Sequence, residues 1–397
     1  MAYPQHLSAG EIEEFGREMD AIRNEVMDSR GDRDRQYILG VIRWQRSMAL
    51  GGRIAMMLSL IVSPWGLLPV ANWAAFLLLL LGGAVLLGLA KILENMEIGH
   101  NVMHAQWDWM RDPNIQSNTW EWDNVCPSDQ WKHSHNVVHH TWTNVLGRDP
   151  DVGYGVLRVS DLQPWHRKYL LNPVINFILM MLFQWGVALH DLEMDKVMAG
   201  ERRYDDIRPK LRRVGWKVWR QLRKDYLLWP LLASAFTLPV TLVLGLPVLS
   251  IAWAAFLTVA AGNFVANGIR NVWSNMIIFC GHFPAGVHHF LPEDVEGETR
   301  AQWYLRQLLG SCNIEGGKVF HILSGNLSHQ IEHHLFPDMP AHRYAEVAPQ
   351  VQAICEKYGL PYHTGSLSRQ YFTVLKRVFK YSLPTRNSGA GAVAAAA

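Results

Sequence analysis

Two long stretches without a charged residue dominate the pattern of apolar and polar positions in this chain. Residues 54–90 contain no Asp, Glu, Lys or Arg, and neither do residues 226–269. One helix crosses the hydrocarbon core of a bilayer with about 20 residues, so each stretch is long enough for a helical hairpin. Turn-forming residues interrupt both stretches, with Pro64 and Pro69 in the first and Gly245 and Pro247 in the second. The pattern predicts four spans, near residues 47–66, 71–95, 226–245 and 249–272.

The loops inside both hairpins lack Lys and Arg, so the positive-inside rule predicts that both termini and the rest of the chain are cytoplasmic. The predicted fold class is an all-α integral membrane protein, with four transmembrane helices in two hairpins and a cytoplasmic helical cap. Ser8 and Glu11 fit a capping box at the start of a helix. The predicted parts are N-terminal cytoplasmic helices (1–45), a membrane and cap domain (46–380, with the cap at 96–225 and 273–380) and a flexible tail (381–397).

Two cytoplasmic segments have more than one interpretation. Residues 170–190 are apolar enough for a fifth span, but such a span would separate the histidine groups described below, so we favour a helix in the membrane interface. Residues 207–224 carry eight Lys and Arg residues with Trp216 and Trp219 between them. This basic helix either contacts anionic lipid headgroups or forms a docking patch for phosphate or an electron donor.

Composition narrows the class of protein. Hydrophobic residues make up 49% and charged residues 18% of the chain, which excludes a disordered protein. The net charge of +2 gives no reason to expect a nucleic-acid partner. The four cysteines follow no C-x-x-C spacing, so we expect them to be reduced and structural.

The 18 histidines gather in three groups. The groups read GHNVMH (99–104), HNVVHH (135–140) and HQIEHH (329–334), and the last two share the spacing H-x-x-x-H-H. Histidines four residues apart on a helix lie on one face and are able to bind one metal ion, while an adjacent histidine points elsewhere. Imidazole suits iron, zinc, copper and nickel. The boxes lie outside the uncharged stretches, and four spans would bring all of them to one side of the membrane, where they predict a site for two metal ions.

The fourth predicted span carries a polar stripe. Asn263, Asn267, Asn271 and Asn275 recur every four residues, and His282 follows on nearly the same face. Polar groups within a membrane face protein or water, so the stripe either packs against other helices or approaches the metal site. For Asn263 and Asn267 we give helix packing and a role at the metal site equal weight. For Asn271, Asn275 and His282 we favour a role at the metal site.

Nine histidines are therefore candidate metal ligands: His100, His104, His135, His139, His140, His282, His329, His333 and His334. Glu97, Asn271 and Asn275 are candidates for orienting the ligand rings. Off-pattern histidines such as His133 and His321 are expected at the surface or behind the ligands.

At these residues the chain resembles the membrane fatty acid desaturases. The three histidine boxes occur in the order of that family, with the hairpins before the first box and between the second and third. The QIEHH form is typical of front-end desaturases and of bacterial acyl-CoA desaturases described as Δ9 enzymes, and ENMEIGHNVMHAQWDWM and DPDVGYG are similar to the bacterial group.

The resemblance implies two iron ions, O2 as co-substrate and two external electrons. It carries over the box histidines and His282 as ligands, while either His329 or Gln330 faces the iron. It also implies a long-chain acyl substrate, with a CoA thioester favoured, and a bacterial inner membrane. The chain has no HPGG haem motif, so no fused haem or flavin is expected. Electrons would come from a separate donor of ferredoxin, rubredoxin or cytochrome b5 type with a reductase.

Several alternatives stay open from the sequence. A front-end desaturase, a fatty acyl hydroxylase or an acetylenase would use the same scaffold, and a zinc-dependent hydroxylase would differ in its metal. A metal transporter or receptor is the non-enzyme alternative, although a transporter needs ligands at the bilayer midplane. The double-bond position, chain length, acyl carrier, redox partner and oligomeric state are not readable from the residues.

Overall fold

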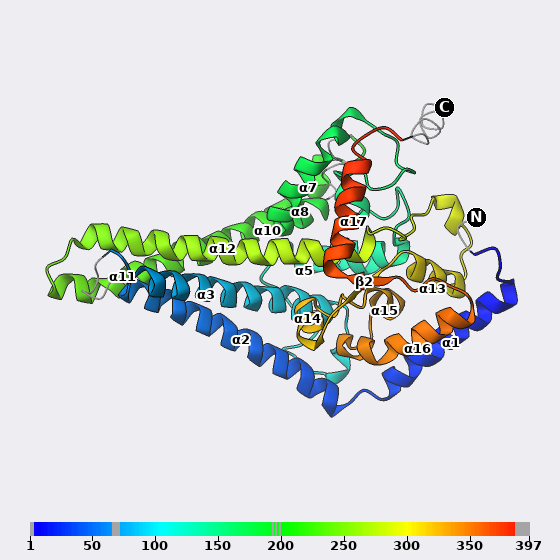
Figure 1. The fold of residues 1–397 in the computed structure, drawn as a ribbon, viewed down its shortest axis with the longest axis horizontal. Coiled ribbons are helices and arrows are strands. Elements are labelled where there is room, and N and C mark those ends of the chain that lie inside the picture. Colours follow the sequence, from blue (N-terminus) through cyan, green and yellow to red (C-terminus); the bar gives the residue numbers. More distant parts are fainter. Residues whose placement is uncertain (1–3, 66–71, 193, 195–196, 198–199, 386–397) are drawn as a thin grey trace.

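The computed structural model describes residues 4–65, 72–192, 194, 197 and 200–385. These residues are mostly helical and extend along one axis (Figure 1). A bundle of long helices fills one end, and a cap of shorter helices fills the other, where α1 (Ala9–Asp28) and α17 (Leu367–Lys380) lie. The long helices are α2 (Asp32–Ile61), α3 (Trp73–Ile92), α11 (Trp229–Val243) and α12 (Val248–His282).

Short helices connect the bundle to the cap and build the cap itself. Between α3 and α11 these are η1 (Leu93–His100), α4 (Asn101–Met103), η2 (Asp108–Met110), α5 (Ser128–Trp131), η3 (Lys132–His139), α6 (His140–Trp142), η4 (Val152–Gly155), η5 (Arg167–Leu171), α7 (Asn172–Met181), α8 (Phe183–His190), α10 (Tyr204–Leu222) and η6 (Arg223–Leu228). After α12 they are η7 (Pro292–Val295), α13 (Arg300–Leu309), α14 (Lys318–Leu323), α15 (Gln330–Leu335), η8 (Ala341–Arg343) and α16 (Tyr344–Lys357).

Three helical stretches of the described residues are long and apolar enough to cross a membrane: Trp73–Met103, Tyr204–Val243 and Val248–His282. They contain the predicted spans near 71–95, 226–245 and 249–272 to within two residues. The predicted span near 47–66 falls on α2, which is not among the three. Arg53 interrupts the apolar run of α2, and the helix ends at Ile61, so this span stays a prediction.

The apolar segment at 170–190 forms α7 and α8, which meet at a bend of 102°. A straight fifth span is therefore not what the chain builds here. The bent pair is either one broken span or two helices at the membrane surface, so its interfacial position stays a prediction.

A buried carboxylate joins the long helices near the cap. Asp225 in η6 is fully buried, and its Oδ2 accepts a hydrogen bond of 2.9 Å from Lys91 Nζ of α3. Its Oδ1 lies 3.4 Å from Arg53 Nη2 of α2, and its Oδ2 also accepts from Asn267 Nδ2 of α12 at 3.2 Å. Asn263 bonds both Arg53 and the Asp225 carbonyl. Asn263 and Asn267 thus bind other helices, which is the packing role left open by the sequence.

Glycines let α2 and α3 approach each other closely. A Cβ atom on Gly83 of α3 would lie 2.9 Å from the carbonyl oxygen of Gly52, and one on Gly52 would lie 2.8 Å from the carbonyl oxygen of Gly83. Both obstacles are backbone atoms, which have little freedom to move aside. Small residues at such crossings are how helices pack when lipid supplies no hydrophobic driving force.

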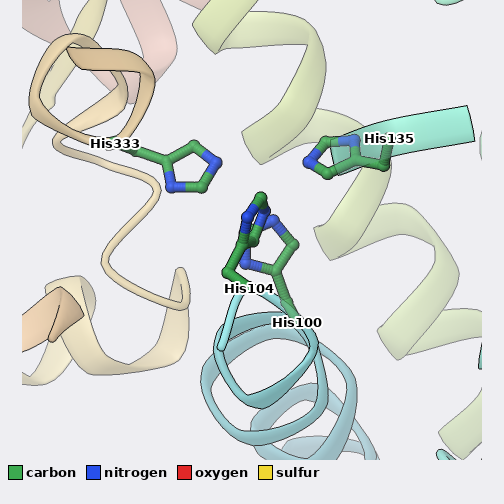
Figure 2. Close-up of side chains that lie close together, drawn as sticks. All are labelled: His100, His104, His135 and His333. Carbon is green, nitrogen blue, oxygen red and sulfur yellow. The ribbon is translucent and has the colours of Figure 1, made fainter. Parts of the chain in front are cut away.

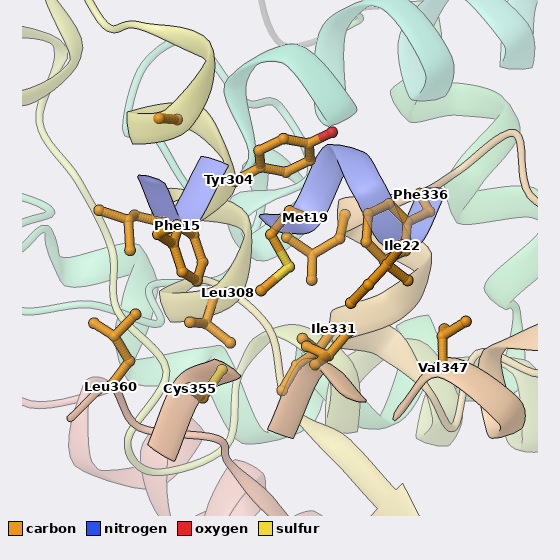
Figure 3. Packing of buried hydrophobic residues seen from close by; sticks show 14 of the residues in the cluster. Phe15, Met19, Ile22, Tyr304, Leu308, Ile331, Phe336, Val347, Cys355 and Leu360 are labelled. Atoms are coloured by element: carbon orange, nitrogen blue, oxygen red, sulfur yellow. The ribbon is translucent and has the colours of Figure 1, made fainter. Parts of the chain in front are cut away.

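The cap has a hydrophobic core of its own. Phe15 and Met19 of α1 pack with Tyr304 of α13, Ile331 of α15 and Val347 of α16 (Figure 3). The start of α1 is fixed as predicted, because the Ser8 side chain accepts from the Glu11 N–H and the Glu11 carboxylate accepts from the Ser8 N–H.

The prediction of an all-α fold is wrong in one detail. Strand β1 (Asn313–Glu315) pairs in parallel with β2 (Thr364–Ser366). The pairing ties the segment before the third histidine box to the segment before α17. Strands of three residues leave no periodic pattern in a sequence, so the helical composition hid them.

Replacing Gly83 with alanine tests the close approach of α2 and α3. We expect Gly83→Ala to lower stability by about 1–3 kcal/mol, because the methyl group overpacks the crossing. Gly82→Ala is the matched control: nothing lies within 4 Å of a Cβ there, and alanine favours a helix by about 1 kcal/mol over glycine. Thermal unfolding in detergent measures both. An unchanged or higher midpoint for Gly83→Ala would contradict the packing described.

Candidate metal centre

The first histidine box lies where the stretch Trp73–Met103 leaves the bundle. The helix continues from α3 into the π-helical η1 and then α4, so the box is built directly on a long rigid element. His100 and His104 are both buried, and their ring centres lie 4.6 Å apart.

The second box forms a second π-helix, η3, followed by α6. It carries His135 and His139 on η3 and His140 at the start of α6. π-Helical turns are rare, and they occur often at functional sites because they redirect side chains. Both boxes that contribute ligands from the first half of the chain use this device.

The second half of the chain completes the site. His282 is the last residue of α12, so a membrane-spanning helix delivers its ring to the cap. His333 and His334 lie on α15, and both are fully buried.

The rings form two clusters, in each of which one nitrogen per residue lies within 4.8 Å of the others. Figure 2 shows the rings of the first cluster pointing into a shared space from three segments of the chain. The first cluster is His100, His104, His135 and His333, and the second cluster is His139, His282 and His334. His140 joins the two, since its ring centre lies 4.8 Å from that of His333 and 4.5 Å from that of His334.

The spacing H-x-x-x-H-H predicts that His135 and His139 share one ion. Their ring centres lie 5.0 Å apart and they form a group with Asp151, but each ring also belongs to a different one of the two histidine clusters. The reason lies outside the box: Asp149 holds Nδ1 of His139, which leaves Nε2 for the cluster with His282 and His334.

Polar partners orient several rings from behind. His100 Nδ1 lies 3.0 Å from Asn101 Oδ1, His139 Nδ1 lies 3.0 Å from Asp149 Oδ2, and His334 Nδ1 lies 2.9 Å from Gln307 Oε1. Such partners fix which ring nitrogen faces a metal and raise its basicity. Sequence reasoning missed Asn101, Asp149 and Gln307 in this role. Only Asp149 had a signal, because the motif DPD follows the second box within ten residues.

The chemistry of the donor set fits metal ions. Among the described residues, no hydrogen-bond partner exists for the buried Nε2 atoms of His104, His135, His139, His140 and His333, for Nδ1 of His140, or for Nδ1 of His282. A buried nitrogen without a partner costs about 1–3 kcal/mol, so the five unpartnered Nε2 atoms favour shared partners. A metal ion in each cluster would bind one nitrogen per ring, and imidazole suits iron among other metals.

Their surroundings hold four rings of the site neutral, whereas nearby carboxylates favour the charged form of His139. Burial, followed by the neighbouring imidazoles, lowers the pKa of His104, His140, His333 and His334 well below its usual value. These rings are therefore neutral at physiological pH, which is the form that binds metal. Burial opposes the charged form of His139 too, but Asp149 and Asp151 outweigh it and raise the pKa to about 9.

Two candidates lie away from the clusters. His329 precedes α15, and its ring centre lies 4.6 Å from that of His321. Its backbone is not helical (φ −100°, ψ 59°), so the four-residue helical spacing to His333 does not hold. Glu97 accepts hydrogen bonds from Tyr37 (2.7 Å) and Asn326 (2.9 Å), and no hydrogen bond joins it to a described histidine.

The remaining candidates lie closer to the site. Gln330 Nε2 lies 2.9 Å from His282 Nε2, so the glutamine of the third box faces the second cluster where His329 does not. Asn271 donates a hydrogen bond of 2.8 Å to the Met181 carbonyl and lines the cavity described next. Asn275 is fully buried, and neither of its side-chain polar atoms has a partner among the described residues.

A partly open cavity adjoins both clusters. His100, His135, His139 and His282 form part of its wall. Apolar side chains form much of the rest, among them Met96, Phe183, Val187, Ile278 and Leu327. A cavity with this lining suits an apolar ligand held against the histidine clusters.

The matching family and the similar proteins agree with one another. The model of the fatty acid desaturase family matches residues 71–366. The chain is 46% identical over 381 residues to the NADPH-dependent stearoyl-CoA 9-desaturase of Mycobacterium tuberculosis, covering 96% of this chain and 82% of the relative. It is 24% identical over 287 residues to the sn-1 linoleoyl-lipid 6-desaturase of Synechocystis, covering 70% of this chain and 74% of the relative. A fatty acid desaturase 2-like protein of Mus musculus is 26% identical over 261 residues, covering 64% of this chain and 46% of that protein. No solved structure matches.

The third box offers a matched pair of variants. We expect His333→Ala to lower the bound metal, because its ring belongs to the first cluster and contacts His140. We expect His329→Ala to keep the full metal content, because its ring lies beside His321 instead. Elemental analysis of the purified proteins measures both. Equal loss of metal in the two variants would place His329 among the ligands and contradict the clusters.

Proposed function

This chain belongs to the fatty acid desaturase family and is an oxidoreductase, and from this premise we propose that it inserts a cis double bond at the Δ9 position of a long-chain acyl-CoA. The observation that carries the proposal is the match, along nearly the whole chain, to a stearoyl-CoA 9-desaturase. Family membership also favours an enzyme over the metal transporter considered from the sequence.

The proposed reaction removes one hydrogen from each of two adjacent methylene groups. The acyl chain, O2, two external electrons and two protons give the alkene and two molecules of water. Two iron ions held by His100, His104, His135, His139, His140, His282, His333 and His334 would supply the activation of O2 that no side chain provides.

The residues of this chain position the substrate and the ligands. Asp149 and Gln307 hold the rings of His139 and His334, so that these ligands do not rotate away. The cavity wall holds the acyl chain against His139 and His282, because both rings line it. Burial of the clusters keeps bulk water away from the reacting carbons.

The electrons are proposed to come from a separate redox protein. The relative from M. tuberculosis is named NADPH-dependent, which supports a donor supplied by an NADPH-oxidising reductase. A ferredoxin, rubredoxin or cytochrome b5 type of donor would each deliver one electron at a time.

We also propose the topology. Helices α2, α3, α11 and α12 would form two transmembrane hairpins, and the cap would lie in the cytoplasm of a bacterium, with both termini on that side. The absence of Lys and Arg from residues 54–90 and 226–269 supports this orientation. The position of α1 and α17 at the cap end supports placing both termini together (Figure 1).

The fatty acid profile of a host that expresses this chain with an NADPH-driven electron donor tests the function. We expect a new monounsaturated acid with its double bond at C9, located by mass spectrometry. His334→Ala should abolish it, because the second cluster loses a ligand. A bond nearer the carboxyl end would indicate a front-end desaturase, and a hydroxylated product would indicate a hydroxylase; either would overturn the Δ9 proposal.

Cysteine labelling in intact cells tests the topology. The four native cysteines are buried, so they give little background. Leu246→Cys places a thiol in the turn between α11 and α12 at the far end of the bundle, and Ser368→Cys places one at the exposed start of α17 in the cap. We expect a membrane-impermeant maleimide to label only the first in intact cells and both after lysis. Labelling of Ser368→Cys in intact cells would reverse the orientation.

A further inference from the structure

The cavity beside the metal clusters follows one face of α12. The residues of this helix that line it are Arg270, Asn271, Ser274, Ile278 and His282. Twelve positions separate Arg270 from His282, which is about 18 Å along a helix. The cavity therefore extends from the second cluster well into the bundle.

At its end away from the clusters, the cavity stops at neighbouring positions on two helices. No residue of α12 before Arg270 lines it, and no residue of the α3–η1 helix before Asn95 does. These two residues are bonded to each other, because Arg270 Nη1 donates to Asn95 Oδ1 at 3.1 Å. The bond connects α12 to η1 and closes the cavity on the side away from the clusters.

Arg270 is an unusual residue for the end of an apolar cavity. Its side chain is fully buried, and its Nε donates to Asn271 Oδ1 at 3.2 Å. Nη2 has no hydrogen-bond partner among the described residues, and the carboxylates of Asp123, Asp225 and Glu94 act on the guanidinium only through longer-range electrostatic attraction. The mechanism makes no use of this group.

A guanidinium at this place has a direct consequence for a hydrocarbon chain. A methyl terminus offers no hydrogen-bond acceptor, so a chain that extended past this point would have to displace the guanidinium from Asn95 and Asn271 and leave more buried donors without partners. Nearer the clusters the wall is apolar, with Met96, Phe183 and Ile278, and it accepts methylene groups without such a cost.

We propose that Arg270, held by Asn95 and Asn271, sets the longest acyl chain that this enzyme accepts. The chain would lie along α12 from the clusters, and its methyl end would stop before the guanidinium. Arg270 is thus a specificity-determining residue. This inference rests on the proposed function, because it requires an acyl substrate in the cavity.

Two substitutions on α12 test the proposal in opposite directions. Arg270→Met removes the charge and keeps a similar length of side chain, so we expect longer chains to be accepted. Ser274→Leu fills the cavity four residues closer to the clusters, about 6 Å along the helix, so we expect only shorter chains to react. Gly268→Ala is the matched control, since Gly268 lies on the same helix, a Cβ there meets nothing within 4 Å, and the residue does not line the cavity.

The measurement uses the full chain in host membranes supplied with saturated acids of increasing length. We expect Arg270→Met to reduce discrimination against chains two carbons longer than the preferred one by about tenfold, a typical value for methylene groups in an apolar pocket. Gly268→Ala should keep the chain-length profile of the unmodified protein.

The results distinguish failure of the proposed function from failure of the chain-length proposal. If the unmodified protein yields no unsaturated product, the proposed function fails. If it is active and Arg270→Met keeps the original profile, the chain-length proposal is overturned. If Arg270→Met does not fold, Ser274→Leu decides, because an unchanged upper limit there would show that the chain does not lie along this face of α12.

Discussion

The burial of eight imidazole rings in one volume is the constraint on which the rest of this structure depends. Neutral rings packed this closely leave several nitrogen atoms without protein partners, and a protein interior does not tolerate that without compensation. Metal ions would supply it, but only if histidines more than 200 residues apart in sequence are held with their ring nitrogens within 4.8 Å of each other, as they are here. The cap core, the two π-helical turns and the buried partners Asp149 and Gln307 all serve that arrangement.

The buried carboxylate of Asp225 fixes the relative heights of the long helices. Asp225 lies where the helices leave the cap, and it binds Lys91 and Arg53 from two other helices. An unpaired carboxylate at this depth would be costly, so each helix is held at the height where its partner reaches the charge. The contact between Gly52 and Gly83 then fixes the distance between α2 and α3. Because α3 leads into His100 and α12 ends at His282, errors in either register would reach the metal clusters.

Much of the site was readable from the sequence, because the spacing of histidines is a local property. The three boxes predicted the ligands around His100, His139 and His334, and the uncharged stretches predicted three helices of sufficient length. The division into two clusters was not readable, because Asp149 turns His139 through a contact outside its box. The place of His329 depends on a backbone turn before α15 that no spacing reports. The sheet β1–β2 was missed for a similar reason, since its two strands are brief and distant in sequence.

The asparagine stripe of α12 shows how one helix serves two environments. Asn263 and Asn267 bind the Asp225 region, so the start of the stripe holds the bundle together. One turn later Asn271 bonds Arg270 and faces the cavity, and the helix ends in His282. A helix that must pass from lipid to a metal cluster has to present polar groups on the side facing protein and apolar groups elsewhere. The same periodicity that packs the bundle therefore carries polar groups to the end of the cavity, where they line its wall instead of packing against another helix.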